Sequence, residues 1–334
     1  MKQMNPQNTS LYKEPIWSKN LVLVMLIMVC IVSAGQLLLP TMPLYTVELG
    51  GTKGMAGLMN MVFSIGALTF RPYAGRLIDG SGRKRTLVIG TIIYIVPFIG
   101  YLMFDSYLVN LFLRFIHGIS LCIITTSLST MATDLIPRTR LTEGIGYYGL
   151  ASAIALTIGP ALGLSIKLNF NMDGIFIFGL VITIVSLVLA ISIAYPEQIN
   201  ESNGTKKSKF QIVQKNSVIP ASIILVVTLS QCLLTTHLAI YCGEIGINNI
   251  SIFFLLTSLG TIISRLVAGK AANKFGEYRV LLFGSVVAFI SFISIAYLQN
   301  YTMLIATALI YGFGYGAIYP IANAMSVRSC NPQD

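Results

Sequence analysis

Runs of about 20 apolar residues, separated by short polar segments, recur along nearly the whole chain. About 20 residues of α-helix cross a hydrocarbon core of roughly 30 Å, so each run predicts one transmembrane helix. The first run is too long for a signal-peptide core and lacks a small-residue cleavage pattern, so it is expected to stay in the mature protein. The pattern predicts an all-α polytopic membrane protein with ten helices, over residues 19–40, 54–75, 84–104, 107–133, 143–166, 173–195, 217–240, 249–272, 279–299 and 302–327.

Composition and charge placement agree with this fold class. The chain is 55% hydrophobic and 10% charged, whereas a soluble domain has roughly 25% charged residues. Its net charge of +10 comes from Lys and Arg that flank the predicted helices, so nucleic acid is not an expected partner. With a cytoplasmic N-terminus, 19 of the 22 Lys and Arg fall inside, Lys53 and Lys167 fall outside, and Arg114 lies within a helix. The positive-inside rule therefore predicts this orientation in a cell membrane, expected to be bacterial.

Several kinds of site are not expected from the sequence. The five cysteines form no CxxC pair, so neither a disulfide framework nor a metal site is predicted. The chain has no GxxxxGK[ST], HExxH or GxSxG motif, so an enzyme with a bound cofactor is not expected. The segment YGFGYGAIYP imitates a phosphate-binding loop, but it lies inside an apolar run with no strand before it, so its glycines are expected to allow close packing.

The second half of the chain repeats the first. A shift of 194 residues aligns SIGALTFRPYAGRLIDGSGRKRTLVIG, from Ser64, with SLGTIISRLVAGKAANKFGEYRVLLFG, from Ser258. A second match aligns YTVELG from Tyr45 with YCGEIG from Tyr241 at an offset of 196, so one loop differs by two residues. Both copies of the basic loop are expected in the cytoplasm, which predicts parallel repeats related by an axis along the membrane normal.

This organisation resembles the major facilitator superfamily over nearly all of the chain. The loop pattern G-x-L-a-D-r-x-G-r-k-x-x-L of that family is matched by Gly75, Leu77, Asp79, Gly82, Arg83, Lys84 and Leu87, with Arg85 in the same basic run. The resemblance implies a six-helix bundle over 1–195, a polar cytoplasmic linker over 196–216 and a second bundle over 217–334. Only four helices are predicted in the second bundle, so the chain is expected to be truncated after its tenth helix.

The basic loop is expected to form a cytoplasmic gate. Gly75 and Gly82 allow a tight turn between helices, and Asp79 is able to pair with an Arg or to cap helix amides. Such contacts, broken and remade as the halves rock, agree with the role that the family assigns to this loop. The alternative is that the basic residues of the loop only anchor the topology.

The fourth predicted helix contains a buried cation. Arg114 and His117 lie one turn apart on one face, with Gly118 beside them. A central Arg costs about 2.5 to 3.5 kcal/mol on the insertion scale, so Arg114 is expected to face a water-filled cavity rather than lipid. The pattern is similar to the R-x-x-x-G motif of the superfamily, which implies a part in proton coupling. The alternative for His117 is a hydrogen-bonded packing residue.

The fifth predicted helix contains Gly159-Pro160-x-x-Gly163, which predicts a kink and a groove that another backbone can approach. This is similar to a motif found chiefly in the antiporting exporters of the superfamily. Ala155 stands where that motif usually has another Gly, so the match is partial. Without the family, the Gly-Pro pair predicts only a bend.

No Asp or Glu lies in the middle of a predicted helix. Proton carriage is therefore expected to depend on His117, on His237, or on Glu48 and Glu244 at the outer rim, where the two carboxylates are alternatively solvated helix ends. Arg114 remains a candidate for proton coupling through the family motif. Uncharged polar and aromatic residues are candidates for the cavity wall, although a single Gln or Asn more often joins two helices. These candidates are Gln36, Asn60, Gln231, Tyr311, Tyr315 and Tyr319.

The sequence as a whole predicts a proton-coupled secondary transporter that exports a small organic molecule, a drug or a metabolite, by alternating access. We expect a monomer whose partners are the lipid bilayer, protons and the substrate. Two alternatives stay open. The first is an importer of sugars or other nutrients with the same architecture, and the second is a non-transporting membrane protein, either a sensor or an inert fragment.

Overall fold

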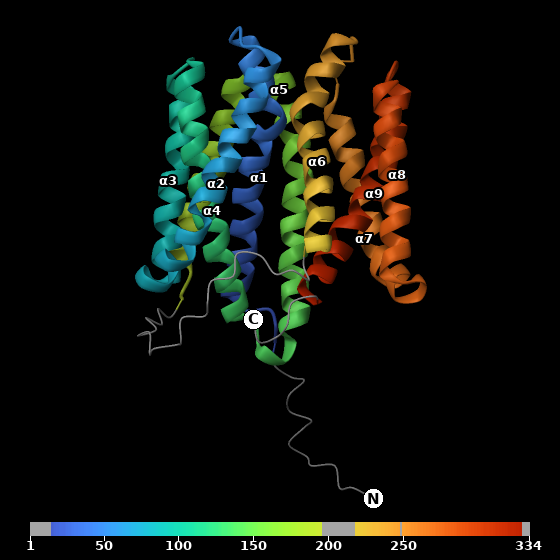
Figure 1. Cartoon of the computed structure of the whole chain (residues 1–334). Coiled ribbons are helices and arrows are strands. Elements are labelled where there is room, and N and C mark those ends of the chain that lie inside the picture. The colour runs from blue at the N-terminus through green and yellow to red at the C-terminus, as the bar shows by residue number, and fades with distance from the viewer. Residues whose placement is uncertain (1–14, 196–217, 248, 329–334) are drawn as a thin grey trace, which may run out of the picture.

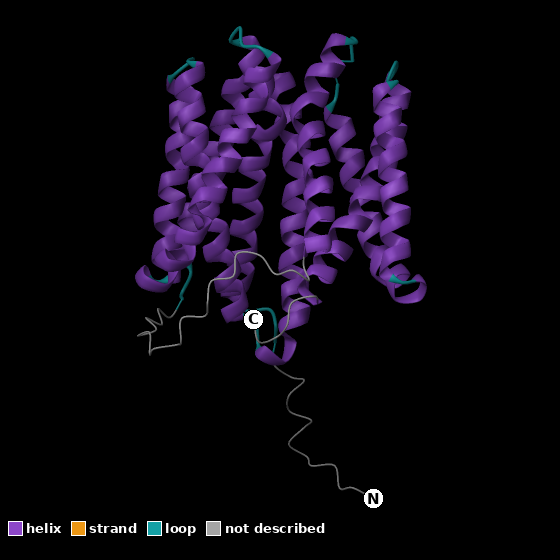
Figure 2. Cartoon of the chain, in the orientation of Figure 1, coloured by secondary structure: helices purple, strands orange, loops and turns teal. Residues whose placement is uncertain are grey.

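The computed structural model describes residues 15–195, 218–247 and 249–328, and in this part of the chain it contains helices and no strand (Figures 1 and 2). The predicted linker 196–216 lies outside the described residues. The helices are α1 (Lys19–Glu48), α2 (Lys53–Ser81), α3 (Arg83–Met103), α4 (Tyr107–Leu135), the short η2 (Arg138–Arg140), α5 (Leu141–Ser192), α6 (Val218–Glu244), α7 (Ser251–Phe275), α8 (Glu277–Ala296) and α9 (Tyr301–Arg328).

Helix α5 contains two of the predicted spans. Its 52 residues would extend about 78 Å as one straight helix, more than twice the thickness of a hydrocarbon core. The backbone breaks at Asn171, where φ is 58° and ψ is −163°, between the predicted spans 143–166 and 173–195. The described helices therefore supply ten crossing segments. By length and composition eight helices qualify as membrane spans, and α2, which carries Arg71, Arg76 and Asp79, is not among them.

The two ends of the bundle differ in charge. The α1–α2, α3–α4, α6–α7 and α8–α9 loops lie at the upper end in Figure 1, and the α2–α3 and α7–α8 turns lie at the lower end. Among the described basic residues, Lys53 and Lys167 are at the upper end, whereas the basic turn after α2 and the η2 arginines are at the lower end. This asymmetry follows the charge pattern on which the predicted orientation rests.

The internal repeat is visible in the turn that joins each pair of helices. Gly82, between α2 and α3, has φ 85° and ψ 150°, and Gly276, between α7 and α8, has φ 90° and ψ 146°. Both glycines adopt a positive φ that other residues rarely occupy, so the same sharp turn occurs 194 residues apart. Gly50 and Gly246, from the second sequence match, likewise have φ values of 83° and 78°.

Glycines also bring the helices of each half into backbone contact. A β-carbon built at Gly118 of α4 would lie 2.0 Å from the carbonyl oxygen of Phe63 in α2. The same construction at Gly312 of α9 would lie 2.2 Å from the carbonyl oxygen of Thr257 in α7. Both residues of this second pair are 194 positions later in the chain. The repeat therefore preserves close helix crossings, in which small residues allow two backbones to approach.

The Gly159 and Gly163 pair packs α5 against α1. A β-carbon at Gly159 would lie 2.4 Å from Cβ of Gln36, and one at Gly163 would lie 2.4 Å from the carbonyl oxygen of Leu37. The groove predicted from the sequence is therefore present, and α1 occupies it.

We expect the substitution Gly118→Ala to destabilise the protein by about 1–3 kcal/mol, because the added methyl group meets the backbone of α2 rather than a movable side chain. The matched control is Gly146→Ala, since no atom lies within 4 Å of a β-carbon built there. Thermal unfolding in detergent measures both. Equal melting temperatures for the two variants would contradict the close crossing of α2 and α4.

Candidate functional site

The two halves of the chain contact each other where α6 packs against α1 and α2 and where α5 packs against α7. At the upper end, Nζ of Lys53 lies 2.6 Å from Oε1 of Glu244. One turn further along α2, Gly57 faces His237, whose Nε2 would lie 3.7 Å from a β-carbon built on the glycine. One more turn along, Nδ2 of Asn60 donates a hydrogen bond of 2.9 Å to Oγ1 of Thr236. We call these three contacts the upper seam.

A second contact joins α5 to α7. Oγ of Ser258 donates a hydrogen bond of 2.8 Å to the carbonyl oxygen of Thr157. Around it, Ala161 and Leu164 of α5 belong to the same apolar cluster as Leu234 and Leu238 of α6. The halves are thus held together by small polar contacts and by a patch of apolar packing.

The same helix faces are uncovered toward the lower end. Leu68 lies three turns below Gly57 on α2 and is 71% exposed. On α6, Leu233 lies three turns before Glu244 and is 60% exposed, whereas Val226, three turns before His237, lines a pocket that it shares with α8 and α9. Below the upper seam, Leu68 and Leu233 are therefore largely uncovered by described residues.

Arg114 lies inside the N-terminal half, close to the upper seam. The side chain is 0% exposed, and its Nη2 donates a hydrogen bond of 2.6 Å to Oδ1 of Asn60. Its Cζ lies 4.7 Å from the centre of the Phe63 ring, a cation–π distance. Nε and Nη1 have no hydrogen-bond partner among the described residues. The expectation that Arg114 faces a water-filled cavity is corrected here, because the Asn60 amide, the Phe63 ring and the phenols of Tyr94 and Tyr101 surround the fully buried cation.

The Asn60 amide joins this cation to the other half. Besides accepting from Arg114, it donates hydrogen bonds of 2.9 Å to the carbonyl oxygen of Leu39 and to Thr236. An amide has two donor hydrogens, and both are used here. Sequence reasoning treated Asn60 as a candidate for the cavity wall and did not predict its link to Arg114. Thr236 was missed altogether.

His117 lies beside Arg114 in an aromatic box. It is 0% exposed, and the centres of the Tyr94, Phe98 and Phe63 rings lie 4.3, 5.2 and 5.7 Å from its own. Its Nδ1 lies 3.5 Å from Oη of Tyr101, and its Nε2 has no partner among the described residues. The structure therefore brings Arg114 and His117 together inside the N-terminal half, whereas the other candidates for proton coupling lie at its upper end or in the upper seam.

Those other candidates lie at the upper end. Glu48 is paired with Lys167 within the N-terminal half, whereas Glu244 and His237 belong to the upper seam. The repeat partners Glu48 and Glu244 thus differ in one respect, since only Glu244 forms an ion pair between the halves.

The gate-motif residues lie at the lower end. Nε of Arg83 lies 2.6 Å from Oδ2 of Asp134 at the end of α4, and the same oxygen accepts a hydrogen bond of 2.5 Å from Tyr195. Burial and the Asp134 carboxylate raise the pKa of the Tyr195 phenol well above its usual range, so it remains a donor. Asp79 is exposed, and within the described residues it forms no ion pair.

The rest of the motif is partly exposed. Lys84 and Arg85 line a pocket of about 600 Å³ with Tyr195 at the end of α5. Gly75 has open space around a built β-carbon, Leu77 is exposed, and Gly82 makes the turn. The three-residue cluster around Asp134 was not predicted, because its members come from distant parts of the chain.

The three tyrosines of α9 form a ladder. The centres of the Tyr311 and Tyr315 rings are 6.0 Å apart, and those of Tyr315 and Tyr319 are 6.4 Å apart, with interplanar angles of 22° and 27°. Tyr311 is buried and donates a hydrogen bond of 2.6 Å to Oε1 of Gln231, whereas Tyr319 is 36% exposed. Tyr319 is therefore the most exposed of the three tyrosines, and Tyr315 is partly exposed.

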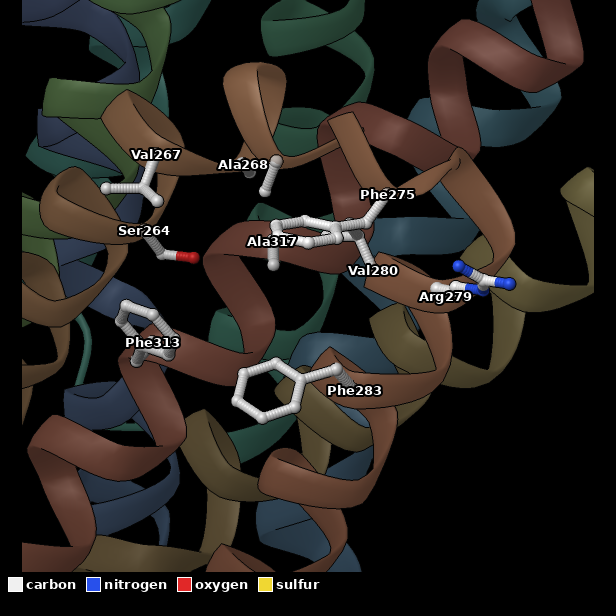
Figure 3. A pocket seen from close by; sticks show the side chains of 10 residues that line it. Ser264, Val267, Ala268, Phe275, Arg279, Val280, Phe283, Phe313 and Ala317 are labelled. Carbon is white, nitrogen blue, oxygen red and sulfur yellow. The ribbon is translucent and has the colours of Figure 1, made fainter. Parts of the chain in front are cut away.

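A separate pocket of about 370 Å³ lies among α7, α8 and α9 (Figure 3). Val267, Phe283 and Phe313 are among its apolar walls, and Ser264 and Arg279 stand at opposite sides of it. Helix geometry places Ser264 about 120° around α7 from Ser258, whose hydroxyl donates a hydrogen bond to the other half. Ser264 is also about 100° around the helix from its neighbour Arg265. This pocket is therefore on a different face from the contacts between the halves.

The model of the Major Facilitator Superfamily matches residues 24–334. The chain belongs to this family. It is a multi-pass membrane transporter and not an enzyme, and the predicted fold class is confirmed. Solved structures of the family share the fold: the nucleoside transporter NupG aligns with a TM-score of 0.72 and 12% identity over 93% of this chain and 87% of that one. A peptide transporter aligns with a TM-score of 0.72 and 14% identity over 99% and 87%.

Similar sequences include named efflux proteins. The chain is 25% identical to Multidrug resistance protein 2 of Bacillus subtilis, over 82% of this chain and 72% of that protein. It is 25% identical to the multi-drug resistance efflux pump PmrA homolog of Lactococcus lactis, over 92% and 80%. It is 24% identical to the staphylopine export protein of Staphylococcus aureus, over 86% and 76%.

We expect Asn60→Leu to destabilise the protein by about 1–3 kcal/mol, because it removes the amide oxygen that accepts a hydrogen bond from the buried guanidinium. The double variant Asn60→Leu/Arg114→Leu should lose less stability than Asn60→Leu alone, since removing both partners leaves no buried charge unpaired. A double-mutant cycle of thermal unfolding in detergent measures this coupling. Additive losses would contradict it.

Proposed function

We propose that this transporter is a proton-coupled exporter of small organic molecules that works by alternating access. The observation that carries the proposal is the one-sided contact between the halves. Lys53–Glu244, Gly57–His237 and Asn60–Thr236 join α2 to α6 at the upper end, and the same faces are exposed below. A rigid scaffold would bury both ends, whereas a rocking pair of halves closes one end at a time.

The contacts of the upper seam are suited to being broken. The Lys53–Glu244 pair has side chains that are 66% and 48% exposed, and such surface pairs contribute about 0–1 kcal/mol. A neutral hydrogen bond such as that of Asn60 contributes about 0.5–1.5 kcal/mol. The seam therefore holds one conformation without preventing its exchange with another.

The direction of transport rests on the relatives and on the charge pattern. Export is the activity that the names of the efflux relatives describe. We assign the basic lower end to the cytoplasm by the positive-inside rule, so this conformation is open to the cytoplasm, where an exporter takes up its substrate. One proton entering down about 100 mV supplies about 2.3 kcal/mol, which supports a substrate gradient of nearly 50-fold.

Proton coupling is assigned to Arg114 and His117. The Asn60 amide connects the Arg114 guanidinium to Thr236 of the other half, so a change of charge beside Arg114 alters a hydrogen bond that closes the upper seam. This is a physical route from a titrating group to the contact between the halves.

The test uses everted membrane vesicles with an acid interior. We expect ethidium or a quinolone to collapse the gradient in vesicles that carry the chain, and Arg114→Ala to abolish the response. Vesicles with Arg76→Gln, which changes an exposed cation, are the matched control. A broad compound panel that leaves the gradient unchanged, or Arg114→Ala vesicles that respond like the wild type, would contradict proton-coupled export.

A second prediction concerns the seam. Gly57→Leu should open the upper end, because the added side chain occupies the place of the His237 ring. In a cysteine-free background with Ala239→Cys, a buried position of α6 outside the three seam contacts, labelling by a membrane-impermeant maleimide should become at least several-fold faster. Gly54→Leu, whose built β-carbon is near only Thr52, is the control. Equal labelling in both variants would show that Gly57 does not form the seam.

A further inference from the structure

Two arginines that are partners in the repeat lie well inside their helices. Arg71 stands ten residues before the end of α2, and Arg265 stands ten residues before the end of α7. At 1.5 Å per residue each lies about 15 Å from the turn at the lower end. The charge pattern of the sequence grouped both with the loop cations, and the structure places them at a depth where a cation is costly.

Both arginines lie on helix faces directed toward the other half. Arg71 follows Lys53 by 18 residues, five full turns of α2, and Lys53 reaches Glu244 of α6. Arg265 follows Ser258 by seven residues, two turns of α7, and Ser258 bonds the carbonyl oxygen of Thr157 in α5. Each arginine therefore lies on the side of its helix that carries contacts with the other half, and Arg71 is also near Cys122 of α4.

Neither charge is compensated within the described residues. Arg71 is exposed, Arg265 is half-buried with a buried Nε that has no hydrogen-bond partner, and no ion pair involves either one. The described carboxylates all lie at helix ends or in loops: Glu48, Asp79, Asp105, Asp134, Glu143, Asp173, Glu244 and Glu277. No described carboxylate therefore lies at the depth of Arg71 and Arg265.

An aromatic surface adjoins Arg265. Tyr315 and Tyr319 of α9 lie near its guanidinium, and the planes of their two rings are at 27° to each other. Tyr319 is partly exposed, so it presents a ring face beside the cation. Aromatic side chains bind planar groups by stacking, and Arg binds carboxylates through paired N–H donors.

We propose that Arg71 and Arg265 bind the carboxylate of an aromatic organic anion, and that this anion is the transported compound. The rings of Tyr315 and Tyr319 hold its aromatic part. This inference rests on the proposed transport function, but its test measures binding and needs no proton gradient, so the two proposals fail separately.

The experiment measures thermal stabilisation of the purified chain by aromatic carboxylates and by their amides, using 2-naphthoate with 2-naphthamide and indole-3-acetate with indole-3-acetamide. We expect the carboxylates to stabilise the protein and the matched amides not to. Arg71→Gln and Arg265→Gln should each weaken binding by at least about 10-fold, as expected for the loss of a hydrogen bond from a charged donor. Arg265→Lys should restore part of the affinity.

Two controls separate binding from folding and from general attraction of anions. Arg76→Gln and Lys274→Gln remove exposed cations elsewhere on α2 and α7 and should leave the affinity unchanged. Tyr319→Phe keeps the ring and should bind like the wild type, whereas Tyr319→Leu should bind several-fold more weakly. The proposal is overturned if no carboxylate stabilises the protein, if amides or aromatic cations such as ethidium stabilise it equally, or if the control variants lose as much affinity as the Arg71 and Arg265 variants.

Discussion

The side-chain amide of Asn60 is the interaction on which the rest of the arrangement depends. It accepts from the buried Arg114 and donates to Thr236, so one group compensates the cation of the N-terminal half and holds the C-terminal half against it. A low-dielectric interior makes an unpaired guanidinium expensive, and this forces Asn60 to keep its position. The seam at the upper end is therefore tied to the electrostatics of the protein interior rather than to surface charge.

Much of the fold follows from features that one sequence displays. The length of the apolar runs sets the number of crossings, and the repeated glycines set the turns and the close crossings. Gly82 with Gly276, and Gly118 with Gly312, have the same structural roles 194 residues apart. The buried polar pair Asn60 and Arg114 is not repeated in the second half, because the residues 194 positions later are Phe254 and Ala308. The duplicated scaffold thus carries its buried charge in one half.

The site was less predictable, because it depends on contacts between distant segments. An Arg in the middle of an apolar run predicts a buried hydrogen-bond acceptor. Nothing in the sequence indicates that this acceptor is Asn60, 54 residues earlier, rather than Gln36 or another polar residue. The number of Lys and Arg residues on each side predicts the orientation of the protein in the membrane, but not how deep in the membrane each residue lies. Arg71 and Arg265 were therefore grouped with the cations of the loops. The Asp134 cluster with Arg83 and Tyr195 was missed for the same reason, since a carboxylate at a helix end has no distinctive local pattern.

The proposed anion site also bears on how the halves exchange conformations. In the proposed alternating-access cycle, closing the lower end would bring the faces that carry Arg71 and Arg265 toward each other. Two like charges about 4 Å apart repel by about 4 kcal/mol at an effective dielectric constant of about 20, which exceeds the contribution of any single contact in the upper seam. A carboxylate between them changes this repulsion into two attractions. Closure of the empty transporter is then disfavoured relative to closure around its substrate, and the cation pair makes exchange between conformations depend on the molecule that is carried.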